Sequence, residues 1–519
     1  MCPARCIRLA LFLVLGLSLG HPHQIGEIYQ LHIPHGLARG NEVDGSFVSY
    51  SVEFSYMKDY AGNLSHPNTL SNQLLQNLFE ASGSYPLIRV GGTTQNKNIW
   101  IQNQSEAIIE IFESPGDDQP TSLSVGPSWL ESFQTFPNGT RYIYGLNFIE
   151  GDAGIEQDVL QASSVVKSLG ESLYAFEIGN EFDAFPINRS DNWSLELYVD
   201  EWMYHATAIE DNITATQDES ARPLFQAGVF AADPELPMQG DTPWTAEAAL
   251  KQGIAETGLV KSWSDHTYMG AICGLPGQET PTLEGTVLNR TNMLERMKTH
   301  EQQADYCAAH GVPYVIGETN SIACQGLAGA SDVFGAALWA ADYTLHAAST
   351  NISRLHFHMG TPYRYSAWQP VDINDTVARA KPVYYGNLFA ATALAGVGKS
   401  VTELVSEEFF SAYGVFGGGD ADGEAELERV VIVNLRMYNA TETAERESVE
   451  VLLPSQMVGR RMGVRRLKGQ GADVADGITW AGRTADAQGK LVGDEVVEEV
   501  AGGRVWVEDS EAVLIAALG

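Results

Sequence analysis

Short apolar runs alternate with longer amphipathic runs over residues 46–360, and this order constrains the fold more than any other feature of the chain. Eight short runs have the length and β-branched content of buried strands. They are Phe47–Phe54, Leu87–Val90, Tyr142–Asn147, Leu173–Ile178, Leu224–Val229, Trp263–Tyr268, Tyr314–Gly317 and Arg354–His358. Helical spacing is clear between them in Leu70–Glu80, Ile155–Ser168, Leu195–Ile209, Leu288–Ala309 and Val333–Ala348.

Strand followed by helix, repeated about eight times, predicts a (β/α)8 barrel or a large doubly wound sheet. We favour the barrel for two reasons. No Gly-x-Gly-x-x-Gly follows the first strand, so a dinucleotide-binding sheet lacks its main motif. The polar and aromatic residues that could carry chemistry also follow several different strands, which is where a barrel places its active site.

From about residue 381 the pattern changes. One helical run, Tyr385–Gly396, precedes short alternating strands separated by Gly and Asp turns, which predict an antiparallel β-sandwich. These strands are Phe409–Phe416, Val430–Asn434, Ser448–Leu453, Gly463–Leu467 and Arg504–Val507. We therefore expect a catalytic barrel over residues 46–380, a sandwich over 381–519, and a segment 21–45 whose Glu27–Ile33 run adds a strand to the sandwich.

The first residues predict export. Arg5 and Arg8 precede the apolar run Leu9–Leu19, and small residues follow, which is typical of a secretory signal peptide spanning residues 1–20. The run is shorter than the roughly 20 apolar residues of a membrane span, so we expect a secreted, extracellular protein without a membrane anchor. Ten Asn-X-Ser/Thr sequons predict N-linked glycans, at Asn63, Asn103, Asn138, Asn188, Asn192, Asn212, Asn289, Asn351, Asn374 and Asn439.

The cysteine content limits the possible disulfides, and the net charge limits the possible partners. Removal of the signal leaves Cys273, Cys307 and Cys324, which allow at most one disulfide and leave at least one cysteine without a partner in this group. The formal net charge of −35 repels phosphate and sulfate polymers, so nucleic acid is not an expected partner. A small substrate, neutral or weakly anionic, fits this charge.

The strongest local motif follows the fourth predicted strand, where Phe176–Asp183 reads Phe-Glu-Ile-Gly-Asn-Glu-Phe-Asp. A strand that ends in Gly-Asn-Glu brings Asn180 and Glu181 together at the mouth of a barrel, between aromatic residues. Partial desolvation there raises a carboxyl pKa and suits a general acid. Glu177 shares a strand face with Glu181 but lies deeper.

A second motif, Val315–Ser321, closes the seventh predicted strand and presents Glu318 after a glycine. Carboxylates from strands 4 and 7 face each other across a barrel mouth. Retaining glycosidases need such a pair about 5 to 5.5 Å apart, and inverting enzymes need about 6.5 to 9.5 Å. A single acidic residue at a strand end is more often a helix cap or a solvated loop residue, but the pair favours glycoside hydrolysis.

Four segments together resemble glycoside hydrolase family 79, a member of the clan A hydrolases. They are Ile88–Thr93, Glu177–Glu181, His266–Tyr268 and Ile316–Ser321. The resemblance implies a retaining exo-β-glucuronidase that acts on glucuronic-acid-containing glycans without a cofactor, with Glu181 as acid/base and Glu318 as nucleophile. It also implies that Asn180 holds the sugar 2-hydroxyl, Tyr268 donates to the nucleophile, and Arg89 lies beneath it.

The resemblance further implies that Glu53 on the first strand accepts sugar hydroxyls. Family β-glucuronidases bind the C6 carboxylate with backbone amides after the nucleophile and a tyrosine after strand 8. By position these are the Ile322–Gly326 loop, with Gly326, and Tyr365; Arg364 is a further candidate.

Other chemistries lack their motifs. His266, His356 and His358 raise the possibility of a metal site, but no Cys or Asp completes a ligand set, so we expect none. Beyond the predicted signal peptide, neither a Gly-x-Ser-x-Gly elbow nor a P-loop occurs. The alternatives that stay open are a heparanase-like endo-β-glucuronidase, another clan A retaining exo-glycosidase such as a xylosidase, and an inactive carbohydrate-binding barrel.

Overall fold

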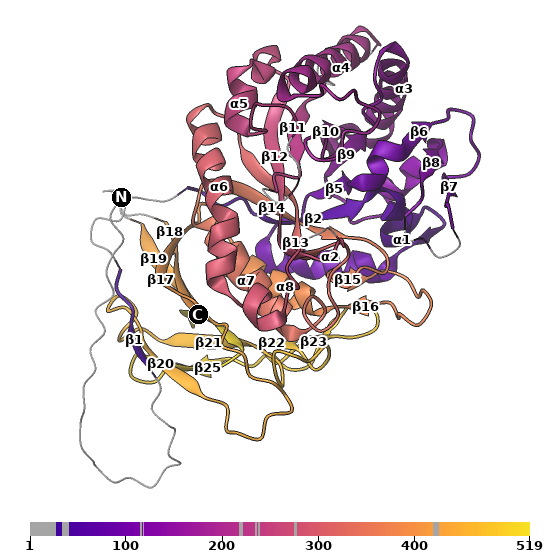
Figure 1. The fold of residues 1–519 in the computed structure, drawn as a ribbon. Coiled ribbons are helices and arrows are strands. Elements are labelled where there is room, and N and C mark those ends of the chain that lie inside the picture. The colour runs from indigo at the N-terminus through magenta and orange to yellow at the C-terminus, as the bar shows by residue number, and fades with distance from the viewer. Residues whose placement is uncertain are drawn as a thin grey trace, which may run out of the picture.

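The structure is a computed structural model that describes residues 27–33, 41–114, 117, 119–216, 222–233, 236, 239–274, 278–418 and 425–518. The predicted signal peptide lies outside these residues. Figure 1 shows a barrel surrounded by helices, with the sheets of the C-terminal region packed against one side of it. Within the described residues, the helices are too short or too polar to span a lipid bilayer.

Eight parallel strands close into a barrel, as the sequence predicts. In ring order these are β10 (Leu173–Ile178), β11 (Phe225–Phe230), β12 (Val260–Ala271), β13 (Tyr314–Ala323), β14 (Ile352–Met359), β2 (Val48–Glu53), β5 (Ile88–Gly91) and β9 (Tyr142–Leu146). All eight correspond to predicted strands. β12 and β13 extend beyond their predicted ends, because the two strands continue to pair as far as Ala271 and Ala323.

Helices cover the outside of the barrel. The longer ones are α2 (Thr69–Ser82), α3 (Asp152–Leu169), α4 (Leu195–Thr216), α6 (Arg290–Ala309), α7 (Phe334–Ala348) and α8 (Pro382–Leu394). Shorter segments are α1 (Met57–Ala61), α5 (Ala246–Lys251), η1 (Phe54–Tyr56), η2 (Thr93–Lys97), η3 (Pro127–Gln134), η4 (Gly170–Ser172), η6 (Ile254–Thr257) and η7 (Leu283–Val287).

Helix α2 shows how the sequence sets these elements. The side chain of Asn68 accepts a hydrogen bond from the N–H of Ser71 and caps the first turn. Gly83 adopts a φ of 85° and ends the helix. Between them Leu70, Leu74 and Leu78 recur on one face and are buried against the barrel.

The strand–helix alternation is interrupted after β5. Instead of an α-helix, the chain forms a three-stranded sheet of β6 (Asn98–Trp100), β8 (Ser122–Val125) and β7 (Ile108–Ile111), followed by the 3-10 helix η3. Small two-stranded pairs join β3 (Gly62–Asn63) to β4 (His66–Pro67), β15 (Trp368–Gln369) to β16 (Arg379–Ala380), and β23 (Thr484–Ala485) to β24 (Leu491–Val492).

Helices α7 and α8 connect the two parts of the molecule. Every residue of α7 is buried, because the helix contacts barrel strands β13 and β14 on one side and the C-terminal sheet on the other. α8 packs on α7 and α2, so it completes the ring of barrel helices. The first C-terminal strand therefore begins at Ser400, about 20 residues after the expected domain boundary.

The C-terminal region is the predicted β-sandwich. Its larger sheet has the order β17 (Ser400–Glu407), β18 (Phe410–Gly417), β19 (Glu426–Asn434), β27 (Glu511–Ala517), β21 (Met462–Lys468) and β22 (Thr479–Trp480), with β25 (Glu498–Glu499) also paired to β21. The smaller sheet joins β1 (Ile28–Gln30), β20 (Ser448–Leu452) and β26 (Arg504–Glu508), and β1 pairs in parallel with β20. Apolar side chains from both sheets form one core.

Candidate active site

Glu181 lies at the mouth of the barrel, three residues after β10 ends at Ile178. Its backbone has a φ of 56°, in the left-handed region that residues other than glycine rarely adopt. The Glu181 N–H donates to the carbonyl of Val229, which lies in the neighbouring strand β11. The chain therefore turns sharply here, and the turn directs the carboxyl group over the barrel opening.

Glu318 lies within β13 and not at its end, because the strand continues to Ala323. The pairing register on both sides of β13 shifts near this residue, between Asp265 and His266 on β12 and between Ile316 and Thr319 on β13. Such a bulge changes the direction of a side chain. Gly317 is required beside it, since a Cβ there would collide with the Ser264 side chain.

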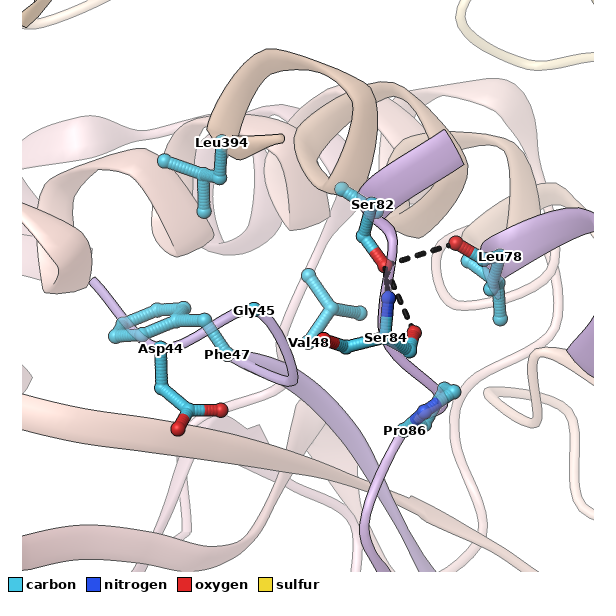
Figure 2. A pocket seen from close by; sticks show the side chains of 10 residues that line it. Asp44, Gly45, Phe47, Val48, Leu78, Ser82, Ser84, Pro86 and Leu394 are labelled. Atoms are coloured by element: carbon cyan, nitrogen blue, oxygen red, sulfur yellow. Dashed lines mark hydrogen bonds between the residues drawn. The ribbon is translucent and has the colours of Figure 1, made fainter. Parts of the chain in front are cut away.

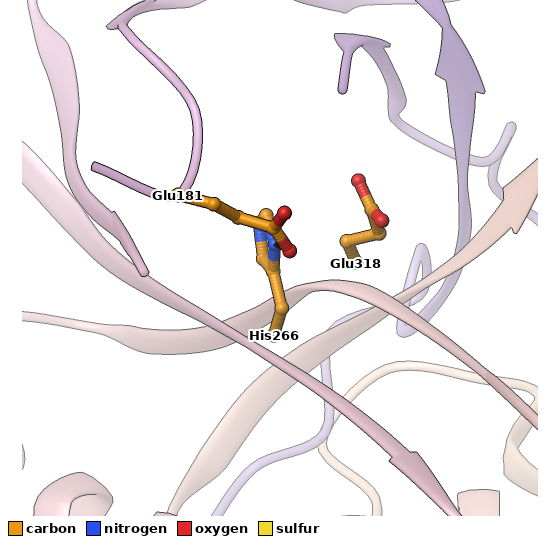
Figure 3. A group of neighbouring side chains, drawn as sticks. All are labelled: Glu181, His266 and Glu318. Atoms are coloured by element: carbon orange, nitrogen blue, oxygen red, sulfur yellow. Dashed lines mark hydrogen bonds and ion pairs between the residues drawn. The ribbon is translucent and has the colours of Figure 1, made fainter. Parts of the chain in front are cut away.

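The two carboxyl groups face a common space, together with His266 (Figure 3). One carboxylate oxygen of Glu181 and one of Glu318 lie within 4.8 Å of each other, and a ring nitrogen of His266 lies within the same distance of both. This separation is shorter than the roughly 6.5 to 9.5 Å of an inverting pair and is closer to the roughly 5 to 5.5 Å of a retaining pair.

Arg89 on β5 lies beneath both motifs and is fully buried. Its guanidinium donates to Glu177 Oε2 at 2.7 Å, to Glu318 Oε2 at 2.7 Å and to Asn180 Oδ1 at 2.7 Å. Ser51 on β2 accepts a fourth hydrogen bond. One side chain thus fixes the nucleophile candidate, the deeper carboxylate and the amide that precedes the acid candidate.

Glu318 is held in its ionised form. Burial alone would raise its pKa, but the positive charges of His358 and Arg89 and a 2.8 Å hydrogen bond from the Tyr268 hydroxyl hold the pKa well below its usual range. Asn180 and Tyr268, both predicted to act at this site, therefore belong to the hydrogen-bond network around Arg89 and Glu318.

Glu181 has the opposite environment. Burial, followed by the negative charge of Glu318, raises the pKa of Glu181 to about 8. Its Oε1 lies 2.9 Å from Nδ1 of His266. Burial lowers the pKa of His266 to about 3, so this imidazole is neutral and adds no positive charge beside the acid. The pair of glutamates thus holds one proton, on Glu181, at neutral pH.

Glu53 ends β2 on the other side of the opening. Its Oε1 accepts from the backbone N–H of Thr94 at 2.8 Å and from the Thr94 hydroxyl at 2.5 Å. Its Oε2 lies 3.5 Å from Nε2 of His358, whose Nδ1 lies 3.5 Å from Glu318. Burial would lower the pKa of His358, but Glu318 and Glu53 raise it, and the imidazole bridges the two carboxylates.

The loop after β13 lies against the loop after β14. A disulfide joins Cys273 and Cys324, directly beyond the last paired residues of β12 and β13, and Cys307 is buried and unpaired. Gly326 has a φ of 85°, and a Cβ there would come within 2.9 Å of the Tyr365 nitrogen. The Tyr365 ring is buried beside that of Tyr268, with 6.0 Å between the ring centroids.

Sequence similarity to known proteins identifies the family of the chain. The model of the glycosyl hydrolase family 79 C-terminal beta domain matches residues 412–514. A protein of Aspergillus niger named beta-glucuronidase is 34% identical over 474 residues, covering 86% of this chain and 84% of its own. A beta-glucuronidase of Neurospora crassa is 32% identical and covers 86% and 85%. The chain belongs to glycoside hydrolase family 79.

Solved structures agree on the architecture of this family member. A 4-O-α-L-rhamnosyl-β-D-glucuronidase from Fusarium oxysporum superposes with a TM-score of 0.76 at 24% identity, covering 94% of this chain and all of the other. A family 51 arabinofuranosidase from Xanthomonas axonopodis has a TM-score of 0.59 at 12% identity, with 95% and 99% covered. Both similarities show the barrel-and-sandwich fold.

The family 79 chain brings together all the site residues that the sequence predicts. Three contributors lie beyond that prediction. His266 belongs to the His266–Tyr268 segment and His358 to a predicted strand, but the sequence analysis gives neither a role at this site. For His358, the alternation with Phe357 and Met359 was the available signal for a position inside the barrel. Asn96 lies between the Ile88–Thr93 motif and β6, in a stretch for which the sequence predicts neither an element nor a function.

The family 79 structure also contains a residue group with metal-ligand spacing and a hollow lined by the starts of two barrel strands. Glu181, His266 and Glu318 have the spacing of a metal-binding group, but Arg89 already places a positive charge on Glu318. The hollow in Figure 2 is lined by Phe47, Val48 and Pro86, which lie at the starts of β2 and β5. It therefore opens at the end of the barrel opposite Glu181.

Proposed function

We propose that the protein is a secreted, N-glycosylated, retaining exo-β-glucuronidase, which releases terminal β-linked glucuronic acid from glycans by double displacement. The spacing of 4.8 Å or less between an oxygen of Glu181 and one of Glu318 carries this proposal. The names of the Aspergillus and Neurospora relatives, which are beta-glucuronidases, support the choice of sugar.

The first step forms a glycosyl-enzyme. The Glu318 carboxylate attacks the anomeric carbon while protonated Glu181 gives its proton to the leaving oxygen, so the glycosidic bond breaks as the ester bond forms. In the second step Glu181 takes a proton from water, the water oxygen attacks the same carbon, and Glu318 leaves as a carboxylate. Arg89 and Tyr268 stabilise that carboxylate before and after the covalent step.

The loops after β13 and β14 are suited to receive the C6 carboxylate. Gly326 lies against the backbone of Tyr365, and the Tyr365 hydroxyl group lies in a buried tyrosine cluster beside Tyr268. Neutral donors of this kind bind an anion without a basic patch, which agrees with the strongly acidic chain.

Exo-action is supported by the opposite wall of the site. β14 lies four strands from β10 in the eight-strand ring, so the region beyond β14 faces Glu181 and the leaving group across the barrel. There the side chain of Gln119 donates to the Tyr363 hydroxyl at 2.9 Å and joins two loops. This contact would close the site beyond the non-reducing end of a single sugar.

Secretion is supported by the placement of the sequons. Of the ten sequon asparagines, seven are exposed and three, Asn289, Asn351 and Asn439, are half-buried. Expression in a eukaryotic host tests this: the protein should appear in the medium, and a glycosidase that removes N-glycans should lower its mass. An unshifted mass of protein retained in the cell would contradict this part of the proposal.

Activity is tested with p-nitrophenyl β-glucuronide, β-glucoside and β-xyloside under identical conditions. The glucuronide should be the preferred substrate by kcat/KM, and Glu318→Ala and Glu181→Ala should each remove turnover of an unactivated glucuronide. Equal turnover of the three substrates, or none of the glucuronide, would contradict the proposed specificity.

A further inference from the structure

The segment that carries Glu181 has little regular pairing to hold it. β10 ends at Ile178, and Gly179 and Glu181 then adopt φ values of 75° and 56°. A left-handed backbone at a residue with a side chain is unfavourable and persists only where its surroundings fix it. The position of the Glu181 carboxyl group therefore depends on what holds Asn180, the residue between these two.

Asn96 supplies that contact. Its side-chain Nδ2 donates to the Asn180 carbonyl oxygen at 2.7 Å, and its Oδ1 accepts from the Asn180 N–H at 2.9 Å. Both residues are buried, at 8% and 2% exposure. The primary amide thus pairs with both polar backbone groups of one residue, as a neighbouring strand would, and it does so where no strand continues.

The two residues before Asn96 in the short helix η2 also hold neighbouring strands through their side chains. Gln95 donates to the carbonyl oxygens of Leu146 and Gly179 at 2.9 and 3.0 Å. Thr94 donates to Glu53 on the other side of the site. Three consecutive buried polar residues of η2 therefore connect β2, β9 and the end of β10, and Asn96 makes the contact nearest to the acid.

We propose that Asn96 is a positioning residue for the acid/base Glu181: its paired hydrogen bonds to the backbone of Asn180 fix the direction in which the Glu181 carboxyl group presents its proton. This inference rests on the proposed function, in which Glu181 protonates the leaving group. Asn96 itself contacts neither acid, so its effect reaches the reaction only through the Asn180–Glu181 backbone.

The dependence of the kcat/KM loss on the leaving group distinguishes a positioning role of Asn96 from a general role in stabilising the fold. A poor leaving group such as phenol requires protonation, whereas an activated one such as 2,4-dinitrophenol departs without it. General acid catalysis contributes roughly 10²- to 10⁴-fold. In Asn96→Ala we expect kcat/KM to fall at least about 50-fold for phenyl β-glucuronide and less than about 5-fold for the dinitrophenyl glycoside.

Asn98 offers a matched control. It is also buried, at 1% exposure, and lies two residues away, but its side chain donates to Gln161 on α3 and not to the acid-bearing segment. Asn98→Ala should change the kcat/KM of both substrates by the same factor. Asn96→Asp, which keeps the oxygen that accepts from the Asn180 N–H and loses the donor, serves as a second variant if Asn96→Ala does not fold, and should show the same selective loss.

Glu181→Ala separates the failure of this inference from the failure of the proposed function. It should lose activity on the phenyl glycoside selectively. If wild-type protein hydrolyses neither glucuronide, or if Glu181→Ala loses both equally, the proposed function is wrong. If Glu181→Ala behaves as expected but both Asn96 variants lose activity on the two substrates by equal factors, or lose none, the positioning role of Asn96 is wrong.

Discussion

The hydroxyl of Tyr268 donates to Oε1 of Glu318 at 2.8 Å, on the carboxylate oxygen opposite the one that Arg89 binds. Each oxygen of the nucleophile candidate therefore has its own donor. Because Tyr268 comes from β12 and Arg89 from β5, the carboxylate is fixed from two sides of the barrel.

Tyr268→Phe should weaken the nucleophile. A hydrogen bond to a charged group contributes about 1.5 to 3 kcal/mol, so kcat/KM should fall roughly 10- to 150-fold. The pKa of Glu318 should rise, which moves the acidic limb of the pH profile to higher pH. Tyr343→Phe is the control, since its buried hydroxyl bonds Thr319 and no carboxylate. Similar losses in both variants would refute the assigned contact.

The pH dependence follows from the two acids. Activity requires Glu181 protonated and Glu318 ionised, and the pKa of Glu181 is raised to about 8 by burial and then by Glu318, whereas that of Glu318 is lowered. Log kcat/KM should therefore be flat at neutral pH and fall as pH rises through about 8. In Glu318→Gln, 13C NMR of Glu181 should report a lower pKa. An unchanged pKa would mean that the two groups do not interact.

The barrel was predictable because each of its strands is a short apolar run and five of the intervening stretches repeat their apolar residues every three or four positions. In the tail the same patterns predicted β18, β19, β20, β21 and β26 but missed two longer strands. β27, Glu511–Ala517, contains three Ala and begins with a Glu, and β17, Ser400–Glu407, mixes polar and apolar residues, so neither was predicted. β27 nevertheless lies between β19 and β21 in the larger sheet, where contacts distant in sequence decide its conformation.

The candidate site was predictable to the extent that its two acids directly follow short apolar runs. Glu181 and Glu318 follow Asn and Gly after apolar runs, and this local pattern marks them. His358 and Asn96 act through partners on other strands, so only the closed barrel brings them to Glu53 and Asn180. The pairing of Cys273 with Cys324 has the same origin, because it depends on the register of β12 and β13.

The disulfide should tune affinity for the uronic acid. It restrains the chain two residues before Gly326, in the loop that we propose binds the C6 carboxylate. Cys273→Ser and Cys324→Ser should each raise KM for p-nitrophenyl β-glucuronide about tenfold, the effect of roughly 1.4 kcal/mol, and leave the slow turnover of the β-glucoside nearly unchanged. Cys307→Ala, at a buried position on α6, is the control for loss of a cysteine. A KM that does not change would place the carboxylate elsewhere.

An ion pair at the junction of barrel and sandwich should stabilise the folded chain at low pH. His346 on α7 lies 2.8 Å from Glu301 on α6 and 3.2 Å from Glu403 on β17. Burial opposes its charge, but these carboxylates raise the pKa of His346 to about 9. Arg290, which also binds Glu403, lies near His346, and its positive charge lowers the pKa of His346.

Because the folded-state pKa of His346 exceeds the unfolded value of 6.5, its contribution is complete below pH 6.5 and is lost as pH rises through about 9. His346→Gln should therefore lower the free energy of unfolding by about 3 kcal/mol at pH 6 and by much less at pH 9.5, measured by urea denaturation. A loss that is equal at both pH values would show that packing, and not charge, is the contribution of His346.

The central claim is that Glu318 forms a covalent bond to the sugar. Incubation with 2-deoxy-2-fluoro-β-glucuronyl fluoride, which slows the second step more than the departure of fluoride, followed by mass spectrometry of the digested protein, tests it directly. The account predicts one added fluoroglucuronyl group on the peptide that contains Glu318. A label on any other residue, or an unlabelled enzyme that releases the α-anomer of glucuronic acid from its natural substrates, would contradict it.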